Sequence, residues 1–309
     1  MSPERPGAPS RKKGATRTHV LLLDTSSVMY RAYYALPDSI TAPDGRPVNA
    51  VHGYLDMTAN LIRNREPGEV IHAFDDDWRP APRVAEYAGY KAERPEEPAD
   101  LTPQFAMLAE VLSAFGMGIA EAPGWEAEDA IGSLVARMSG RDRAEIVTGD
   151  RDLIQLVRDP QVKLLYTRKG VSQLDVLDEQ AVEEKYGVPA SRYADFAILR
   201  GDPSDGLPGV RGVGEKTARA LVAEYSSIDE MVADAQAERR TGAALKKSPA
   251  LRARIADAAE YLEAMKKVVP IRTDLEVRLH RVKRDDAALD RLAESFGLAG
   301  PIGRLRAVI

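Results

Sequence analysis

The chain contains no cysteine in its 309 residues. This absence excludes disulfides, thiol nucleophiles and cysteine-ligated zinc sites together. Histidine is also scarce, and the four histidines form no zinc-binding pattern: His19, His52, His72 and His280. A chain without disulfides fits a reducing compartment, and we therefore expect a cytoplasmic protein.

Long apolar segments are missing as well. No run is long enough to span a bilayer, and residues 1–17 lack the apolar stretch of a signal peptide. Those first residues are rich in Pro, Gly, Ser, Arg and Lys, which predicts a disordered basic arm. Apolar residues make up 44% of the chain and charged residues 29%, so we expect a soluble, core-forming protein without membrane contacts.

Short apolar segments alternate with helical patterns in the first half of the chain. We expect strands at 19–24, 69–75, 117–121, 144–148 and 162–166. Helical spacing predicts helices over 48–62, 105–115 and 131–138, the second with Thr102 as its N-cap and Pro103 at its first position. This alternation is typical of an α/β fold with a parallel sheet flanked by helices on both faces.

From about residue 186 the pattern becomes helical. The clearest helices are expected at 191–200, 215–225 and 251–268, and 233–247 is expected to form a solvated connection. We therefore divide the chain into an α/β domain over 18–185 and a helical region over 186–309.

Acidic residues gather where the predicted elements end. Nine of them follow a strand or the helix at 191–200: Asp24, Asp75, Glu126, Glu128, Asp129, Asp150, Asp152, Asp202 and Asp205. The carboxyl ends of parallel strands lie at one edge of a sheet, where ligands bind. Carboxylates gathered there would repel one another strongly, and ligation by carboxylates alone suits hard cations such as Mg²⁺ and Mn²⁺. Two such ions can activate a water and stabilise the leaving oxygen in phosphodiester cleavage.

A purely structural interpretation stays open for each single acid. An aspartate after a strand often caps the following helix, and Glu128 would complement a helix dipole. Independent capping does not require that at least three strands end in the same way, so the agreement among strands favours a shared metal site.

A glycine-rich turn joins two predicted helices at 206–218. Glycines let the backbone approach a phosphate closely, and the amides that open the next helix favour an anion. The residues expected to contact DNA here are Gly209, Gly212, Gly214, Lys216 and Thr217. An ordinary tight hairpin with glycine caps is the alternative, and the acidic pair directly before the turn makes it the weaker one.

Residues 79–94 mix arginine and lysine with tyrosine and lie in a proline-containing stretch without a clear period. Tyrosines between cations suit phosphate contacts and base stacking on a single strand, although a solvated charged loop explains the spacing equally well. The net charge of −5 argues against nucleic acid when taken alone. Removing the nine candidate acids leaves the rest of the chain at +4, which is compatible with a DNA-binding face.

Taken together, these strings resemble the bacterial and phage 5′-3′ exonucleases, including the 5′-nuclease domain of family A DNA polymerases, and more distantly the flap endonucleases. The matching strings are Leu-Leu-Asp24 with Tyr30-Arg31, Phe74-Asp75, Tyr87-x-x-Tyr90-Lys91, Gly124-Trp-Glu-Ala-Glu-Asp129, Thr148-Gly-Asp-Arg-Asp-Leu153, Gly201-Asp-Pro-Ser-Asp-Gly-Leu-Pro-Gly209 and Gly212-Val-Gly-Glu-Lys-Thr-Ala218. The similarity covers roughly residues 18 to 280.

The resemblance implies a PIN-like nuclease core, a helical arch at about 78–101 through which a 5′ single strand passes, and a helix–hairpin–helix motif at about 198–225. It implies a monomeric enzyme of DNA replication and repair that hydrolyses DNA at 5′ flaps, nicks or 5′ overhangs. Its cofactors would be one to three Mg²⁺ or Mn²⁺ ions, with a K⁺ held by backbone carbonyls of the hairpin.

The same resemblance assigns roles by motif position. The nine acids named above would hold the metals, and Asp150 would be catalytic. Lys91 and Arg83 would act near the scissile phosphate. The expected DNA contacts outside the hairpin are Tyr30, Arg31, Tyr87, Tyr90 and Arg94.

Some positions depart from the family pattern. Glu128 stands where the family has aspartate, and Thr25 replaces a glycine after Asp24. The sequence carries no polymerase domain, so we expect a stand-alone nuclease. Two alternatives remain: a non-catalytic or weakly active DNA-structure-binding protein of the same fold, motivated by Glu128, and an RNA-directed PIN-type nuclease, against which the hairpin argues.

Overall fold

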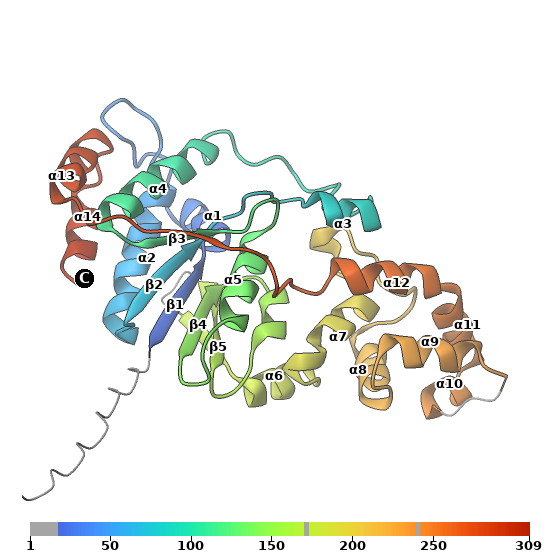
Figure 1. The fold of residues 1–309 in the computed structure, drawn as a ribbon. Helices are drawn as coiled ribbons and strands as arrows, with labels where there is room; N and C mark the ends of the chain where they lie inside the picture. The colour runs from blue at the N-terminus through green and yellow to red at the C-terminus, as the bar shows by residue number, and fades with distance from the viewer. Residues whose placement is uncertain (1–17, 170–172, 239–241) are drawn as a thin grey trace, which may run out of the picture.

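The computed structural model describes residues 18–169, 173–238 and 242–309, so the basic arm expected at 1–17 lies outside the described residues. The strands are β1 (His19–Asp24), β2 (Glu69–Ala73), β3 (Gly118–Glu121), β4 (Arg143–Thr148), β5 (Val162–Lys169), β6 (Gln173–Leu177) and β7 (Arg278–His280). They form one seven-stranded sheet in the order β6-β5-β4-β1-β2-β3-β7 (Figure 1). Every strand predicted from the sequence is present, and the expected α/β fold is confirmed.

The sheet is mixed rather than wholly parallel, which corrects the prediction. The five strands β1 to β5 pair in parallel, whereas β6 and β7 join the two edges antiparallel. All three residues of β7 are exposed, so no buried apolar pattern marks this strand in the sequence.

Alternate residues of β1 enter two separate cores, as the two-residue period of a strand requires. Val20 and Leu22 belong to the core that includes Ile131, whereas Leu21 and Leu23 belong to the core that includes Leu108. The helix on the first face is α5 (Ala127–Ala136), and those on the second are α1 (Thr25–Ala35), α2 (Asn49–Arg65) and α4 (Thr102–Phe115). Helices therefore cover both faces of the sheet, as predicted.

A group of helices lies to one side of the sheet in Figure 1. It comprises α6 (Glu179–Tyr186), α7 (Tyr193–Arg200), α8 (Glu215–Glu224), α9 (Ile228–Gln236), α10 (Ala243–Lys247), α11 (Pro249–Asp257) and α12 (Ala259–Val268). The helix predicted over 251–268 is thus two helices, because the backbone at Ala258 (φ −86°, ψ 6°) leaves the helical conformation. The connection predicted over 233–247 is helical at both ends, and its residues 239–241 lie outside the described part.

The chain after α12 returns to the sheet. β7 pairs with β3, and the helices α13 (Asp286–Ser295) and α14 (Ala299–Arg306) contact α4 and α2. Leu289 and Leu305 share one core with Leu21. The region predicted as helical over 186–309 is therefore divided between the helical group and the sheet.

The predicted arch at 78–101 is helical only over α3 (Ala81–Glu86), which lies beside α12 (Figure 1). Pro80 and Pro82 stand at the start of α3, a position proline tolerates, and Pro95 and Pro98 oppose a continuous helix further on. Helix α4 begins at Thr102 and follows Leu101 as its N-cap, so the predicted capping role of Thr102 is wrong. No helix in the described part of the chain is long and apolar enough to cross a membrane.

Candidate active site

Two of the predicted acids stand where inner strands of the sheet end. Asp24 is the last residue of β1 and also the N-cap of α1, because its carboxylate accepts a hydrogen bond from Ser27 N at 3.2 Å. Thr148 Oγ1, at the end of neighbouring β4, donates to the same carboxylate at 2.6 Å. Asp75 follows β2 and accepts from Ser26 Oγ at 2.5 Å and from Ala127 N at 2.7 Å. Asp24 therefore caps a helix, as the structural interpretation expects. It also lies at the end of a strand, where the metal-site interpretation expects it.

Three further acids occupy the start of α5. Glu126 is its N-cap residue, and Glu128 and Asp129 lie in its first turn. One carboxylate oxygen of each lies within 4.8 Å of those of the other two, and the group has the spacing of a metal-ligating set. Glu126 and Asp129, three residues apart, therefore lie on the same side of the start of α5.

The remaining acids reach the same region from two loops. Asp150 and Asp152 follow β4, and Asp152 N donates to Asp150 Oδ1 at 2.9 Å. Asp202 and Asp205 bracket a 3₁₀ turn after α7, and Asp202 caps that turn. Lys91 links this loop to α5, because its Nζ lies 3.9 Å from Asp205 and pairs with Glu126.

Burial and mutual repulsion raise the pKa of most of these carboxyl groups. Burial raises the pKa of Asp24 to about 7, and the charges of Asp75 and Asp150 add to the effect. Burial, and then the neighbouring acids, hold the pKa of Glu128 and of Asp152 well above the usual range. For Asp205, burial raises the pKa to about 6, although Lys91 opposes the shift. The fold therefore concentrates more negative charge than the nearby cations offset.

This donor set fits a divalent metal. It consists of carboxylate oxygens, which hard cations such as Mg²⁺ and Mn²⁺ prefer. The nearby lysine and arginine side chains do not neutralise all of these carboxylates, so the raised pKa values persist. Glu126 is the exception, since Lys91 and Arg83 outweigh the effect of burial and lower its pKa.

Two cations of the arch, Arg83 and Lys91, contact the acids, and the side chain of Arg83 is the more buried of the two. Its side chain is 1% exposed and pairs with Glu126, with Glu128 at 3.2 Å and with both oxygens of Asp129. An arginine so enclosed contacts carboxylates in this structure, and its place beside the scissile phosphate stays a prediction. Arg94, by comparison, is exposed and lines the same cleft as Asp24 and Asp150.

The tyrosines predicted to contact DNA are mostly covered. Tyr90 is 2% exposed, and its hydroxyl donates to Glu126 at 2.7 Å, so its ring offers no face to a base. Tyr87 packs edge-on against Tyr261, with ring centroids 6.0 Å apart. Tyr30 is half-buried in the cleft wall, and its hydroxyl lies 3.3 Å from Glu97.

The cleft itself has a volume of 1520 Å³, and aromatic residues line it together with the acids. Among them, Tyr34 and Trp78 are 74% and 48% exposed. The sequence reasoning missed both. Tyr34 lies one helical turn after Tyr30, a spacing that marks a shared helix face and was the available signal.

The predicted hairpin is present between α7 and α8. Gly209 (φ 67°) and Gly212 (φ 72°) adopt left-handed backbone, and Gly214 is the N-cap of α8. At Gly209 a Cβ would lie 2.5 Å from the backbone oxygen of Arg200, so only glycine fits. Lys216 is exposed in the first turn of α8, whereas Thr217 is half-buried. Arg31, which was predicted to contact DNA, donates from Nη1 to the backbone oxygen of Arg168 at 3.1 Å.

Comparison with known proteins gives consistent matches along the chain. Residues 19–187 match the N-terminal resolvase-like domain of 5′-3′ exonucleases, and residues 188–290 match their C-terminal SAM fold. A 5′-3′ exonuclease of Streptomyces coelicolor is 44% identical over 92% of this chain and 98% of its own length. A 5′-3′ exonuclease of Mycobacterium tuberculosis is 41% identical over 94% of this chain and 97% of its own length.

Among solved structures, the bacteriophage T5 flap endonuclease in complex with DNA and metal ions shares the fold. The TM-score is 0.63 at 16% identity, over 94% of this chain and 97% of that one. From the two domain matches and the identity to full-length relatives, the chain belongs to the 5′-3′ exonuclease family.

Proposed function

We propose that this protein is a structure-specific 5′ nuclease that hydrolyses DNA phosphodiesters with divalent metal ions. The observation that carries the proposal is the buried carboxylate cluster at the ends of β1, β2 and β4 and the start of α5. Full-length relatives named 5′-3′ exonucleases support the reaction class. The related T5 flap endonuclease, solved with DNA and metal ions, supports the substrate class.

The metals proposed are Mg²⁺ or Mn²⁺, because every ligand offered is a carboxylate oxygen. When bound, such ions supply an activated water and stabilise the leaving oxygen. All nine acids stay candidates, with Asp24, Asp75, Glu126, Glu128 and Asp150 lining the cleft. Asp129 is the least accessible, since its oxygens already accept from Arg83 and from Arg272 N at 2.8 Å.

For the cations of the arch, we assign separate roles. Lys91 and Arg94 both line the cleft and are the groups proposed to hold the scissile phosphate. Arg83 is proposed to order the acids of α5 instead, because it is enclosed by Glu126, Glu128 and Asp129. This division replaces the phosphate contact expected for Arg83 from its motif position.

The proposed substrates are duplexes with a 5′ flap, a nick or a 5′ overhang. The turn at Gly209–Gly214 with Lys216 would hold the duplex, and backbone carbonyls of this turn are proposed to hold a K⁺. The single strand would lie in the cleft, whose exposed residues Tyr34 and Trp78 suit unstacked bases. We further propose that the protein acts on DNA as a monomer in the cytoplasm.

Incubation with a labelled 5′-flap duplex tests this function. Cleavage in Mg²⁺ or Mn²⁺, its loss in EDTA and a preference for DNA over RNA flaps are expected. If the RNA flap is cut and the DNA flap is not, the substrate class is wrong.

One observation favours a second function, a DNA-structure-binding protein with little or no activity. The resemblance described above implies an aspartate where this chain has Glu128, and the Glu128 carboxylate is 3.2 Å from Arg83. Tight binding of the flap duplex without any product after long incubation with either metal would establish this second function.

A further inference from the structure

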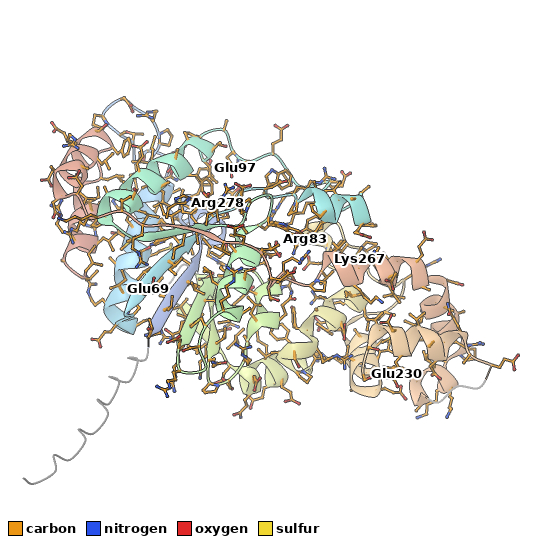
Figure 2. The ribbon with its side chains drawn as sticks, viewed as in Figure 1. Glu69, Arg83, Glu97, Glu230, Lys267 and Arg278 are labelled. Atoms are coloured by element: carbon orange, nitrogen blue, oxygen red, sulfur yellow. The ribbon has the colours of Figure 1, made fainter. Side chains whose placement is uncertain are left out.

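The base of the arch is clamped by the helical group. Lys267 Nζ on α12 pairs with Glu86 on α3 at 3.0 Å. A Cβ at Gly206 would lie 2.5 Å from the backbone oxygen of Gly89, so the two loops touch. Figure 2 labels Arg83 and Lys267, whose helices α3 and α12 lie side by side. Residues 86–91 therefore rest on the helical group along their length.

Tyr261, on α12, lies in the middle of this contact. Its ring meets the ring of Tyr87 edge-on, at 6.0 Å between centroids and 82° between planes. Its hydroxyl accepts a hydrogen bond from Gly209 N at 3.0 Å. One side chain thus contacts both the arch and the glycine turn proposed to hold duplex DNA.

The clamped segment also brings one cation and one hydroxyl to the acids. Tyr90 and Lys91 both reach Glu126. Lys91 holds a left-handed backbone (φ 51°), which is unfavourable for a residue with a side chain and persists only where its surroundings enforce it. The enforcing contact is the hydrogen bond from Lys91 N to the backbone oxygen of Asp205 at 2.9 Å. The place of Lys91 in the cleft therefore depends on the helical group.

We propose that Tyr261 is a positioning residue that links duplex binding at the glycine turn to the placement of Lys91 in the cleft. A duplex held at Gly209 fixes the position of the Gly209 amide, which donates a hydrogen bond to the Tyr261 hydroxyl. The Tyr261 ring then holds Tyr87, and Tyr87 holds the turn that presents Lys91. This inference rests on the proposed nuclease function.

Two substitutions break this link at different points. Tyr261→Phe removes the hydroxyl and keeps the ring, whereas Tyr87→Leu removes the ring on the arch side. For each, we expect an unchanged dissociation constant for a metal-free duplex and an approximately tenfold lower single-turnover rate on a 5′-flap substrate. The double variant is expected to match the slower single variant rather than show a loss of about a hundredfold, since both changes interrupt one path.

Amide hydrogen exchange gives a readout independent of cleavage. In the intact protein, a metal-free duplex without a flap is expected to slow exchange at residues 86–91, and Tyr261→Phe is expected to abolish that slowing. Tyr225→Phe serves as the matched control, because it removes a buried hydroxyl that bonds Asp234 at 2.6 Å in the same helical group. The control is expected to leave both readouts unchanged.

Weaker duplex binding at an unchanged cleavage rate in Tyr261→Phe would overturn the proposal, as would additive losses in the double variant or an equal loss in Tyr225→Phe. An amide exchange rate at residues 86–91 that does not change when the duplex binds would also overturn the proposal. If the intact protein cuts no flap, the nuclease function fails, and the exchange experiment still decides the link.

Discussion

Arg83 donates two hydrogen bonds to Asp129, from Nη2 to Oδ1 at 2.8 Å and from Nη1 to Oδ2 at 2.9 Å. Both side chains are buried, at 1% and 0% exposure. The pair joins the arch to the start of α5 and partly neutralises the acids there. Removing a single partner of a buried ion pair leaves an unpaired buried charge, which usually costs several kcal/mol.

We predict that Arg83→Met destabilises the protein by about 3–5 kcal/mol in EDTA, which lowers the melting temperature by roughly 5–8 °C. Mn²⁺ should restore part of this loss, because it supplies charge to the same carboxylates. Arg46→Met, at the exposed pair with Asp44, is the control and should change the melting temperature little. A melting temperature unchanged by Arg83→Met in EDTA would contradict the account.

Asp150→Asn should reduce flap cleavage by about a thousandfold or more, which corresponds to about 4 kcal/mol in the barrier. The substitution removes one proposed ligand and keeps the shape of the side chain, so the fold should persist with an equal or higher melting temperature. Asp229→Asn, at an exposed carboxylate paired with Lys266 on the helical group, should retain full activity. Substantial cleavage by Asp150→Asn would exclude a direct role for Asp150.

Lys216→Ala should weaken duplex binding and lower the salt dependence of the binding constant by about one unit of logarithmic slope, because one phosphate contact is lost. Lys283→Ala, at an exposed lysine beside β7, tests whether charge alone explains the effect. Titration of a fluorescent duplex at several salt concentrations measures both slopes. Equal slopes for Lys216→Ala and the intact protein would remove Lys216 from the interface.

His72 makes the stability of the sheet depend on pH. The ring is fully buried, burial lowers its pKa to about 3, and its Nδ1 lies 2.6 Å from the hydroxyl of Tyr54. Since the folded pKa lies below the value of 6.5 for a free histidine, its stabilisation is complete above pH 6.5 and is lost as the pH falls toward 3.

Between pH 7 and pH 5 this loss should reach about 2 kcal/mol. His72→Asn keeps a hydrogen-bonding group near Tyr54 but does not titrate, so denaturant unfolding of this variant should show a flatter pH dependence over that interval. If the stability of His72→Asn has the same pH dependence as that of the intact protein, His72 does not cause the loss of stability between pH 7 and pH 5.

Most residues of the proposed site could be predicted from the sequence because their placement depends on local patterns. Asp24 and Asp75 are placed by strands whose buried apolar runs can be recognised directly, and Glu126 and Asp129 by the three-residue spacing of a helix turn. The burial of Tyr90 was not predictable, because it depends on tertiary contacts with Glu126 and Arg83. The enclosure of Arg83 likewise depends on residues distant in the chain, because Glu126, Glu128 and Asp129 surround its guanidinium. β7 could not be predicted, because a short exposed edge strand shows no alternation of apolar and polar residues.

Anomalous scattering from crystals soaked in Mn²⁺ would show whether the clustered carboxylates bind a divalent metal. We predict at least one strong peak within ligand distance of the carboxylates of Asp24, Asp75, Glu128 or Asp150, at the carboxyl edge of the sheet. Such a peak should weaken or disappear in Asp150→Asn. An anomalous map without a peak among these carboxylates, at a Mn²⁺ concentration that supports cleavage in solution, would contradict the account.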